Sequence, residues 1–234
     1  TKLNKSYDVV IIGAGVHGLS TAYYLAKMGI TDVAVFDKGY VGGGGSARST
    51  AIVRANYSTP EAIPFFKESL RLYEQLSQEL KFNILFNQMG RLDLGHSESD
   101  IYNLNIRAEF NQSLGVDSRM IFPEVIKKIE PQLDLRIGKS HPVLAALYHP
   151  PAGPVRHDAV VWGYARAASK LGVQIFPFTE VTEFSKSNSV IKGVKTEKGL
   201  VFADIVVNAT ASWSSNVMSL IGLTLPIVTY PLQA

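Results

Sequence analysis

The chain has 234 residues, of which 46% are hydrophobic and none is cysteine, and its formal net charge is +3 at pH 7. This apolar content is enough for a packed core and excludes general disorder. The lack of cysteine excludes a disulfide framework, a thiolate metal site and a cysteine nucleophile. With no run of five like charges and no long apolar run, the sequence predicts neither a nucleic-acid-binding arm nor a membrane span. We expect a soluble, cytoplasmic protein.

The first residues have the pattern of a βαβ unit. Residues 7–12 form an apolar, mostly β-branched run typical of a strand buried in a parallel sheet, and residues 31–36 predict a second one. Between them a helix is predicted over residues 16–28, which begins at a glycine-rich turn and ends at Gly29. A strand, helix and strand within about 30 residues favour an α/β fold with a parallel sheet.

The rest of the chain mixes helices and short strands. Helices are predicted over residues 60–80, 98–114, 123–129, 157–171 and 212–221, and strands over residues 91–95, 173–176, 180–185, 190–196, 200–203 and 204–209. The strands between residues 180 and 203 have the spacing of a β-meander. Residues 42–46 read as an irregular glycine loop, and residues 150–154, rich in proline and glycine, mark the clearest break in the chain.

The turn after the first strand, Gly13-Ala14-Gly15-Val16-His17-Gly18, matches the pattern G-x-G-x-x-G. Gly13 permits the tight turn, Gly15 lets the backbone approach a pyrophosphate, and Gly18 allows close packing of helix on strand. The pyrophosphate would lie at the helix N-terminus, where N–H groups favour anions. Asp37, at the end of the second strand, would accept hydrogen bonds from the adenosine ribose. These residues predict a site for an ADP-containing dinucleotide; the alternative is a glycine-rich turn without ligand.

FAD and NAD share this turn, and the segment that follows favours FAD. A long run of glycine and hydroxyl residues between positions 38 and 50 suits a flexible backbone that follows an extended FAD molecule. The candidate cofactor contacts beyond Gly13, Ala14, Gly15, Gly18 and Asp37 are His17, Lys38, Gly45, Ser46, Ser49 and Thr50. The alternative for this segment is a surface loop without a ligand. The five histidines lack metal-ligand spacing, so no metal site is predicted.

Residues 7–18, 37–39 and 45–57 resemble the D-amino-acid oxidase and sarcosine oxidase superfamily of FAD-dependent oxidoreductases. Segments 156–159, 162–168 and 230–234 are more specifically similar to the β subunits of heterotetrameric sarcosine oxidases. The resemblance covers essentially the whole chain. It implies flavin-dependent oxidation of the C–N bond of a secondary or tertiary amine such as sarcosine, with possible α, γ and δ partner subunits. The alternatives are a related proline, glycine or dimethylglycine oxidase or dehydrogenase, and a catalytically incomplete flavin-binding assembly module.

The resemblance implies roles for further residues. Arg54 matches the position that supplies the cation for the substrate carboxylate, which a guanidinium fork suits. Arg48 is a second candidate catalytic residue, expected to face the flavin or its phosphates. His157 matches the histidine that carries covalently attached FMN, and an imidazole nitrogen is nucleophilic enough for that attachment. Val181 matches a backbone contact to the adenine. The alternatives are a surface or structural ion pair for each arginine and a helix cap or a surface residue for His157.

The implied fold is α/β: a discontinuous, Rossmann-like FAD-binding domain of the glutathione-reductase type with an inserted, partial α+β substrate domain. We expect residues 1–88 and 150–234 to form the FAD-binding domain and residues 89–149 the partial substrate domain. In the family, more of the substrate-domain sheet and another FAD-contacting strand come later, so we expect this chain alone to bind flavin weakly or not at all. Residues 208–213 resemble the segment N-A-x-G-x-W that closes under FAD, with Ala211 in place of the glycine.

Overall fold

The computed structural model describes residues 2–135 and 141–230, which divide into two compact units. Among these residues, unit 1 comprises those up to Thr50, the short segment Leu80–Ile84 and those from Arg156 onward. Unit 2 comprises Ala51–Glu79 and Leu85–Val155. Residues 231–234, part of the ending that supports the resemblance, lie outside the described residues. No described helix combines the length and the apolar character needed to cross a membrane.

The units differ from the predicted domains at their edges. Residues 51–79, predicted within the FAD-binding domain, belong to unit 2, because helix α2 (Ala62–Glu79) packs Ile63 and Leu70 against Ala55 and Val116 of that unit. Residues 150–155 also belong to unit 2, because β7 (Gly153–Pro154) pairs with β3 (Ile52–Val53). Unit 2 therefore extends beyond residues 89–149 at both ends.

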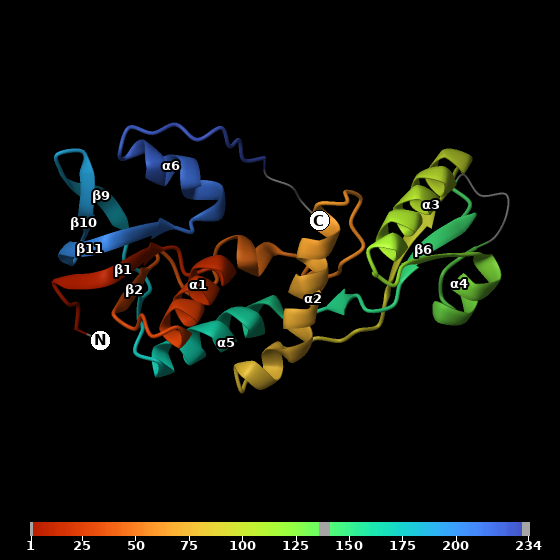
Figure 1. Ribbon diagram of the computed structural model, residues 1–234, viewed down its shortest axis with the longest axis horizontal. Helices are drawn as coiled ribbons and strands as arrows, with labels where there is room; N and C mark the ends of the chain where they lie inside the picture. Colours follow the sequence, from red (N-terminus) through yellow and green to blue (C-terminus); the bar gives the residue numbers. More distant parts are fainter. Residues whose placement is uncertain (1, 136–140, 231–234) are drawn as a thin grey trace. The chain divides into compact units, whose positions relative to one another are not determined.

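Unit 1 is built on a six-stranded sheet with the strand order β8-β2-β1-β11-β10-β9. Its strands are β1 (Ser6–Ile12), β2 (Val33–Phe36), β8 (Gln174–Phe176), β9 (Val181–Ser187), β10 (Val190–Thr196) and β11 (Gly199–Asn208). The pairs β1–β2, β2–β8 and β1–β11 are parallel, and β9, β10 and β11 form an antiparallel meander (Figure 1). The predicted βαβ unit and β-meander are confirmed.

Strand β11 replaces two predicted strands. Residues 199–202 pair antiparallel with β10, and the strand continues without a break so that residues 202–208 pair parallel with β1. No glycine or proline occurs between Leu200 and Asn208, and the strand runs on without a turn. The predicted burial of residues 204–209 is wrong within this structure, since Ile205 is 57% exposed.

Helices α1 (Val16–Lys27) and α5 (His157–Lys170) lie side by side in unit 1 (Figure 1). Their contact includes Tyr23 and Tyr164, whose ring centroids are 5.7 Å apart. The helix predicted over residues 212–221 begins instead as a 3₁₀ turn, η2 (Ala211–Trp213), and continues as α6 (Ser214–Ser219).

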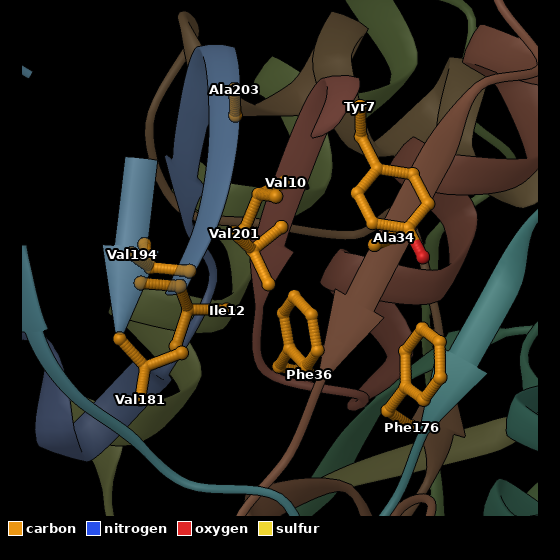
Figure 2. Packing of buried hydrophobic residues seen from close by; sticks show 10 residues of the cluster. All are labelled: Tyr7, Val10, Ile12, Ala34, Phe36, Phe176, Val181, Val194, Val201 and Ala203. Atoms are coloured by element: carbon orange, nitrogen blue, oxygen red, sulfur yellow. The ribbon is translucent and has the colours of Figure 1, made fainter. Parts of the chain in front are cut away.

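One core cluster of unit 1 combines aliphatic side chains from the sheet with two stacked aromatic rings. Phe36 and Phe176 stack with ring centroids 5.2 Å apart, and Figure 2 shows them next to each other on neighbouring strands. Ile12, Val194 and Val201 bring β1, β10 and β11 into the same cluster. Because β-branched and aromatic residues pack well on a pleated surface, the six strands share one continuous core.

Unit 2 contains a three-stranded antiparallel sheet with the order β4-β6-β5. Its elements are β4 (Arg91–Gly95), α3 (Glu98–Ser113), β5 (Arg119–Ile121), α4 (Pro123–Ile129) and β6 (Ala145–His149). Ile121 and Ile126 pack with Val143 and Ala146 in its core. Strands β5 and β6 were not predicted, since β5 has three residues and β6 contains no β-branched residue.

Candidate flavin and substrate site

The predicted cofactor residues gather at the carboxyl end of the parallel strands of unit 1. Strands β1, β2, β8 and β11 end in register. Just beyond the strands, the backbone N–H groups of Gly13, Asp37 and Ala209 still donate to carbonyls of the neighbouring strands, at 2.7, 3.1 and 2.8 Å. Ligands of open α/β sheets bind at this edge. The sheet therefore positions the glycine turn and Asp37 together.

The glycine turn leaves no room for side chains. Gly13 has a φ of +110°, and a Cβ there would lie 2.5 Å from the carbonyl oxygen of Ala209. A Cβ on Gly18 would overlap the carbonyl oxygen of Gly13, and one on Gly15 would lie 3.2 Å from Ser46 Oγ. The backbone at the start of α1 thus carries no side chain at Gly15, next to the N-terminus of the helix, where N–H groups favour anions. This cradle fits the pyrophosphate of FAD.

Two side chains brace the turn. Ser46 Oγ accepts a hydrogen bond from the Val16 N–H at 3.0 Å. The Asp37 carboxylate accepts hydrogen bonds from the N–H groups of Ala14 at 2.7 Å and Gly39 at 2.8 Å. Asp37 thus has a structural role in addition to the predicted ribose contact. Since each carboxylate oxygen accepts about two hydrogen bonds, both oxygens retain capacity for a ribose hydroxyl.

The glycine loop is more ordered than the sequence indicates. The predicted irregular segment contains a 3₁₀ turn, η1 (Gly45–Arg48). Arg48 Nη1 donates to the carbonyl oxygens of Gly43 and of Gly44, the latter at 2.8 Å. A guanidinium can satisfy several carbonyls because it presents five N–H donors. In the structure, the Arg48 side chain therefore stabilises the backbone of its own loop. The catalytic role of Arg48 stays a prediction, and these hydrogen bonds do not support it.

The other predicted cofactor contacts of unit 1 are spread around this edge. Lys38 is exposed, and its Nζ lies 4.5 Å from the ring centroid of Trp213, a cation–π contact. His17 is exposed on the first turn of α1, and Ser49 and Thr50 are exposed at the end of the glycine loop. Val181 begins β9, with its side chain in the core. The contact of Trp213 with Lys38 was not predicted from the sequence, although Trp213 is the last residue of the segment that resembles N-A-x-G-x-W.

His157 is the first residue of α5. Its ring is partly exposed, while Nδ1 is buried and makes no hydrogen bond within the described part of the chain. Its neighbours Arg156 and Asp158 form an ion pair with 2.7 Å between Nη2 and Oδ2. The hydrogen bond from Arg156 lowers the pKa of Asp158 to about 2, so this carboxylate is ionised beside the imidazole. An unpaired buried ring nitrogen is an exception among polar groups in proteins.

Arg54 lies in unit 2, directly after β3. Its Nη1 donates to the backbone carbonyl of Asn56 at 2.9 Å and to Asn56 Oδ1 at 3.2 Å. Its guanidinium carbon lies 4.1 Å from the ring centroid of Tyr57. Burial and the neighbouring charges of Arg91 and Arg107 lower the pKa of Arg54. Among its contacts with described residues, Arg54 donates hydrogen bonds only through Nη1, so the other edge of the fork suits a carboxylate.

Asp93 of β4 is the acidic centre of a polar cluster beside Arg54. Its carboxylate accepts hydrogen bonds from Arg91 Nε at 2.9 Å, Arg107 Nη2 at 2.7 Å and Asn56 Nδ2 at 3.1 Å. Burial raises the pKa of Asp93, but the hydrogen bond from Arg91 and the charges of Arg107 and Arg91 outweigh it, and the pKa falls below its ordinary value. The sequence did not predict this cluster. The one signal for it is that Arg91 and Asp93 share a face of a strand.

His149, at the end of β6, holds the backbone beside Arg54. The residue is fully buried, and its Nε2 accepts a hydrogen bond from the Ala55 N–H at 3.1 Å. Its Nδ1 therefore carries the proton and donates to the Asp117 carbonyl oxygen at 2.5 Å. Burial lowers the pKa of His149 and favours this neutral form.

No group of three potential metal ligands occurs among the described residues.

The chain is similar to two sarcosine oxidase β subunits over nearly its whole length. It is 46% identical to "Sarcosine oxidase subunit beta" of Arthrobacter sp, covering 98% of this chain and 57% of that protein. It is 42% identical to the protein of the same name from Rhizobium meliloti, covering 97% of this chain and 55% of that protein. The chain therefore spans little more than half the length of these relatives.

Solved structures with the same fold include a dehydrogenase and an oxidase that are named for amino acids. L-proline dehydrogenase from P. horikoshii superposes with a TM-score of 0.87 at 32% identity, covering 94% of this chain and 57% of that one. Glycine oxidase from Geobacillus kaustophilus superposes with a TM-score of 0.85 at 26% identity, covering 95% and 60%. Residues 8–234 match the family described as "FAD dependent oxidoreductase". The chain thus belongs to the family of FAD-dependent oxidoreductases and has its α/β FAD-binding fold.

Proposed function

We propose that this chain provides the FAD-binding turn and a substrate-binding arginine of an enzyme that oxidises sarcosine. The observation that carries the proposal is the 46% identity to a sarcosine oxidase β subunit over 231 residues, an alignment long enough to include both the glycine turn and Arg54. The coverage of 57% of that relative means that the activity belongs to the complete protein. A related proline oxidoreductase is the second candidate, favoured by the superposition on L-proline dehydrogenase.

Each part of the candidate site has a task in this reaction. The bare turn from Gly13 to Gly18 binds the pyrophosphate, and Asp37 binds the ribose. Arg54 binds the carboxylate of the amino acid with the edge of its guanidinium that makes no protein hydrogen bond. FAD, when bound, accepts the hydride equivalent that the substrate carbon next to nitrogen loses. By holding the carboxylate, Arg54 orients that carbon, and such fixed orientation lowers the barrier of the reaction.

We further propose that His157 carries FMN covalently and that the chain works in a hetero-oligomer with α, γ and δ subunits. The subunit names of the relatives support the hetero-oligomer. The buried, unpaired Nδ1 and the partly exposed ring of His157 are compatible with attachment through Nε2. The position of His157 at the start of α5 would place a flavin phosphate near helical N–H groups.

The substrate assignment is tested by flavin reduction in the complete protein. The holoenzyme is mixed without oxygen with sarcosine, proline, glycine or dimethylglycine, and the absorbance of the oxidised flavin is followed. We expect sarcosine to bleach the flavin at the highest kcat/KM. Faster bleaching by proline would support the proline oxidoreductase, and no bleaching by any of these amines would support an assembly module.

The FMN assignment has its own test. The complete complex is precipitated in acid, digested, and searched for a flavin-bearing peptide. We expect the peptide that contains His157 to retain the flavin and His157→Asn to lose it while FAD content stays constant. Flavin found entirely in the acid supernatant would eliminate the covalent attachment.

A further inference from the structure

Asn56 is the fully buried centre of the polar cluster beside Arg54. Its side-chain Nδ2 donates to Asp93 Oδ2 at 3.1 Å, while its Oδ1 accepts from Arg54 Nη1 at 3.2 Å. Its backbone carbonyl accepts from the same Nη1 at 2.9 Å and from Arg107 Nε at 2.8 Å. Exchanging the amide oxygen and nitrogen would break both side-chain bonds. Asp93 therefore fixes which end of the Asn56 amide faces Arg54.

The charges around Asn56 are unbalanced. Arg54, Arg91 and Arg107 lie within one cluster, and Asp93 is the acid that pairs with Arg91 and Arg107. The two neighbouring guanidinium groups disfavour the charged form of Arg54, whereas Asp93 favours it. Without the Asp93 charge, three like charges would repel one another at short range in a partly buried site. Arg54 would then move first, since Asn56 and one aromatic ring are its described contacts.

An aromatic stack sets the plane of the Arg54 guanidinium. The Tyr57 ring lies 4.1 Å from the guanidinium carbon, and the opposite side of the stack is Phe66, whose ring centroid is 3.6 Å from that of Tyr57. A flat guanidinium on an aromatic face can still rotate within its plane. The two acceptors on Asn56 prevent this rotation by binding Nη1. Together they leave one defined edge of Arg54 for a ligand.

We propose that Asn56 is a positioning residue for Arg54 and that Asp93 acts through Asn56, so that the pair sets the affinity of the enzyme for the substrate carboxylate. The proposal rests on the function proposed above for Arg54. It assigns to Asp93, 37 residues away from Asn56 in the chain, a role in substrate binding without contact to the substrate or the flavin. A substrate analogue that has the carboxylate but no oxidisable amine reports this role directly.

The test measures acetate binding to the complete holoenzyme by the perturbation of the flavin spectrum. Asp93→Asn keeps the size of the side chain but removes its charge, and we expect it to raise the acetate Kd and the sarcosine KM about tenfold each, with kcat changed less than twofold. Asn56→Ser removes both amide contacts to Arg54 and Asp93 and should have the same signature. The matched control is Glu109→Gln on α3, an exposed acid that contacts Asn105 rather than the cluster.

Arg54→Gln separates this proposal from the proposed function. If it leaves the acetate Kd unchanged, the assignment of Arg54 to the carboxylate is wrong. If Arg54→Gln weakens acetate binding while Asp93→Asn and Asn56→Ser bind acetate like the wild type, the positioning role is overturned and the function stands. A fall in kcat without a rise in KM or in the acetate Kd would also overturn it, because that pattern marks an interaction made only in the transition state and not one that binds the carboxylate. If either Asp93→Asn or Asn56→Ser loses FAD, the acetate Kd of the other variant tests the positioning role.

Discussion

At the scale of single residues, Gly18 leaves no room for a side chain, since a Cβ there would lie 1.9 Å from the carbonyl oxygen of Gly13. Its missing Cβ is what allows α1 to pass the carbonyl of Gly13. We expect Gly18→Ala to lower the free energy of unfolding by about 3 kcal/mol and to abolish FAD retention, because the backbone of the turn must shift. Gly45→Ala is the control for stability, since a Cβ there meets nothing within 4 Å. Urea unfolding of the complete protein measures both; equal stability of the two variants would contradict the geometry of the turn.

His149 predicts a pH dependence of stability. Its folded-state pKa is lowered by burial, so between that value and about 6.5 the unfolded chain binds a proton that the folded protein does not. Stability should therefore fall as the pH drops below about 6.5, by up to about 1.4 kcal/mol per pH unit from this residue. His149→Gln should flatten this part of the pH profile of unfolding, with His17→Gln as the control for loss of an exposed histidine. An unchanged slope in His149→Gln would show that the ring is not held neutral.

The residues that the sequence predicted are those whose role follows from local spacing. Gly13, Gly15 and Gly18 lie within one turn, and Asp37 follows the next strand, so the βαβ pattern alone places them together. Asn56, Asp93 and Arg107 meet only because segments 14 and 37 residues apart pack against one another. No periodicity in the sequence reports such a contact. Arg48 shows that local spacing can also mislead about a residue's role, since an arginine in a loop can bind the backbone of that loop as readily as a ligand.

At the scale of elements, helix α3 depends on its first turn. Ser97 Oγ accepts a hydrogen bond from the Asp100 N–H at 3.1 Å, and Asp100 Oδ2 accepts from the Ser97 N–H at 3.0 Å, forming a capping box. We expect Ser97→Ala to destabilise unit 2 by about 1 kcal/mol. Ser113→Ala, at the other end of the helix, is the control. Hydrogen exchange along α3 should speed up in Ser97→Ala alone, and equal exchange in both variants would contradict the role of the cap.

Elements with a strong local pattern were predicted and those shaped by pairing were not. Helix α4 and strand β4 have the predicted bounds because proline, glycine and alternation mark them in the sequence. Strand β6 contains Ala145 and Ala146, which carry no strand signal; it forms because it pairs with both β4 and β5. Tertiary pairing likewise joins two predicted strands into β11. Context overrides propensity most easily in such short segments.

At the scale of the whole molecule, cofactor binding should stabilise unit 1. FAD that binds the folded turn and not the unfolded chain raises stability by mass action. We expect removal of FAD from the complete protein to lower its Tm and to speed hydrogen exchange in peptides covering residues 9–19 and 39–48. Exchange in α4, which contains no predicted cofactor residue, serves as the internal control. Unchanged exchange in the two unit 1 peptides would place the cofactor elsewhere.

The division into units shows why domain edges are hard to read from a sequence. The resemblance implies a first FAD-binding segment of residues 1–88, which includes the helix predicted over residues 60–80. In the structure, Ile63 and Leu70 of α2 are buried in unit 2 instead. An amphipathic helix shows that it has a buried face but not which neighbour covers that face. The six-stranded sheet, whose pairing follows from the βαβ and meander patterns, was predictable in outline.

Binding of the substrate carboxylate by Arg54 is tested most directly by the sarcosine dependence of flavin reduction in Arg54→Gln. The rate of anaerobic bleaching is measured against sarcosine concentration in the complete holoenzyme and in this variant at equal FAD content. Loss of the charged fork should raise the apparent Kd for sarcosine on the order of 100-fold. An apparent Kd equal to that of the wild type, with FAD fully retained, would contradict the substrate role of Arg54.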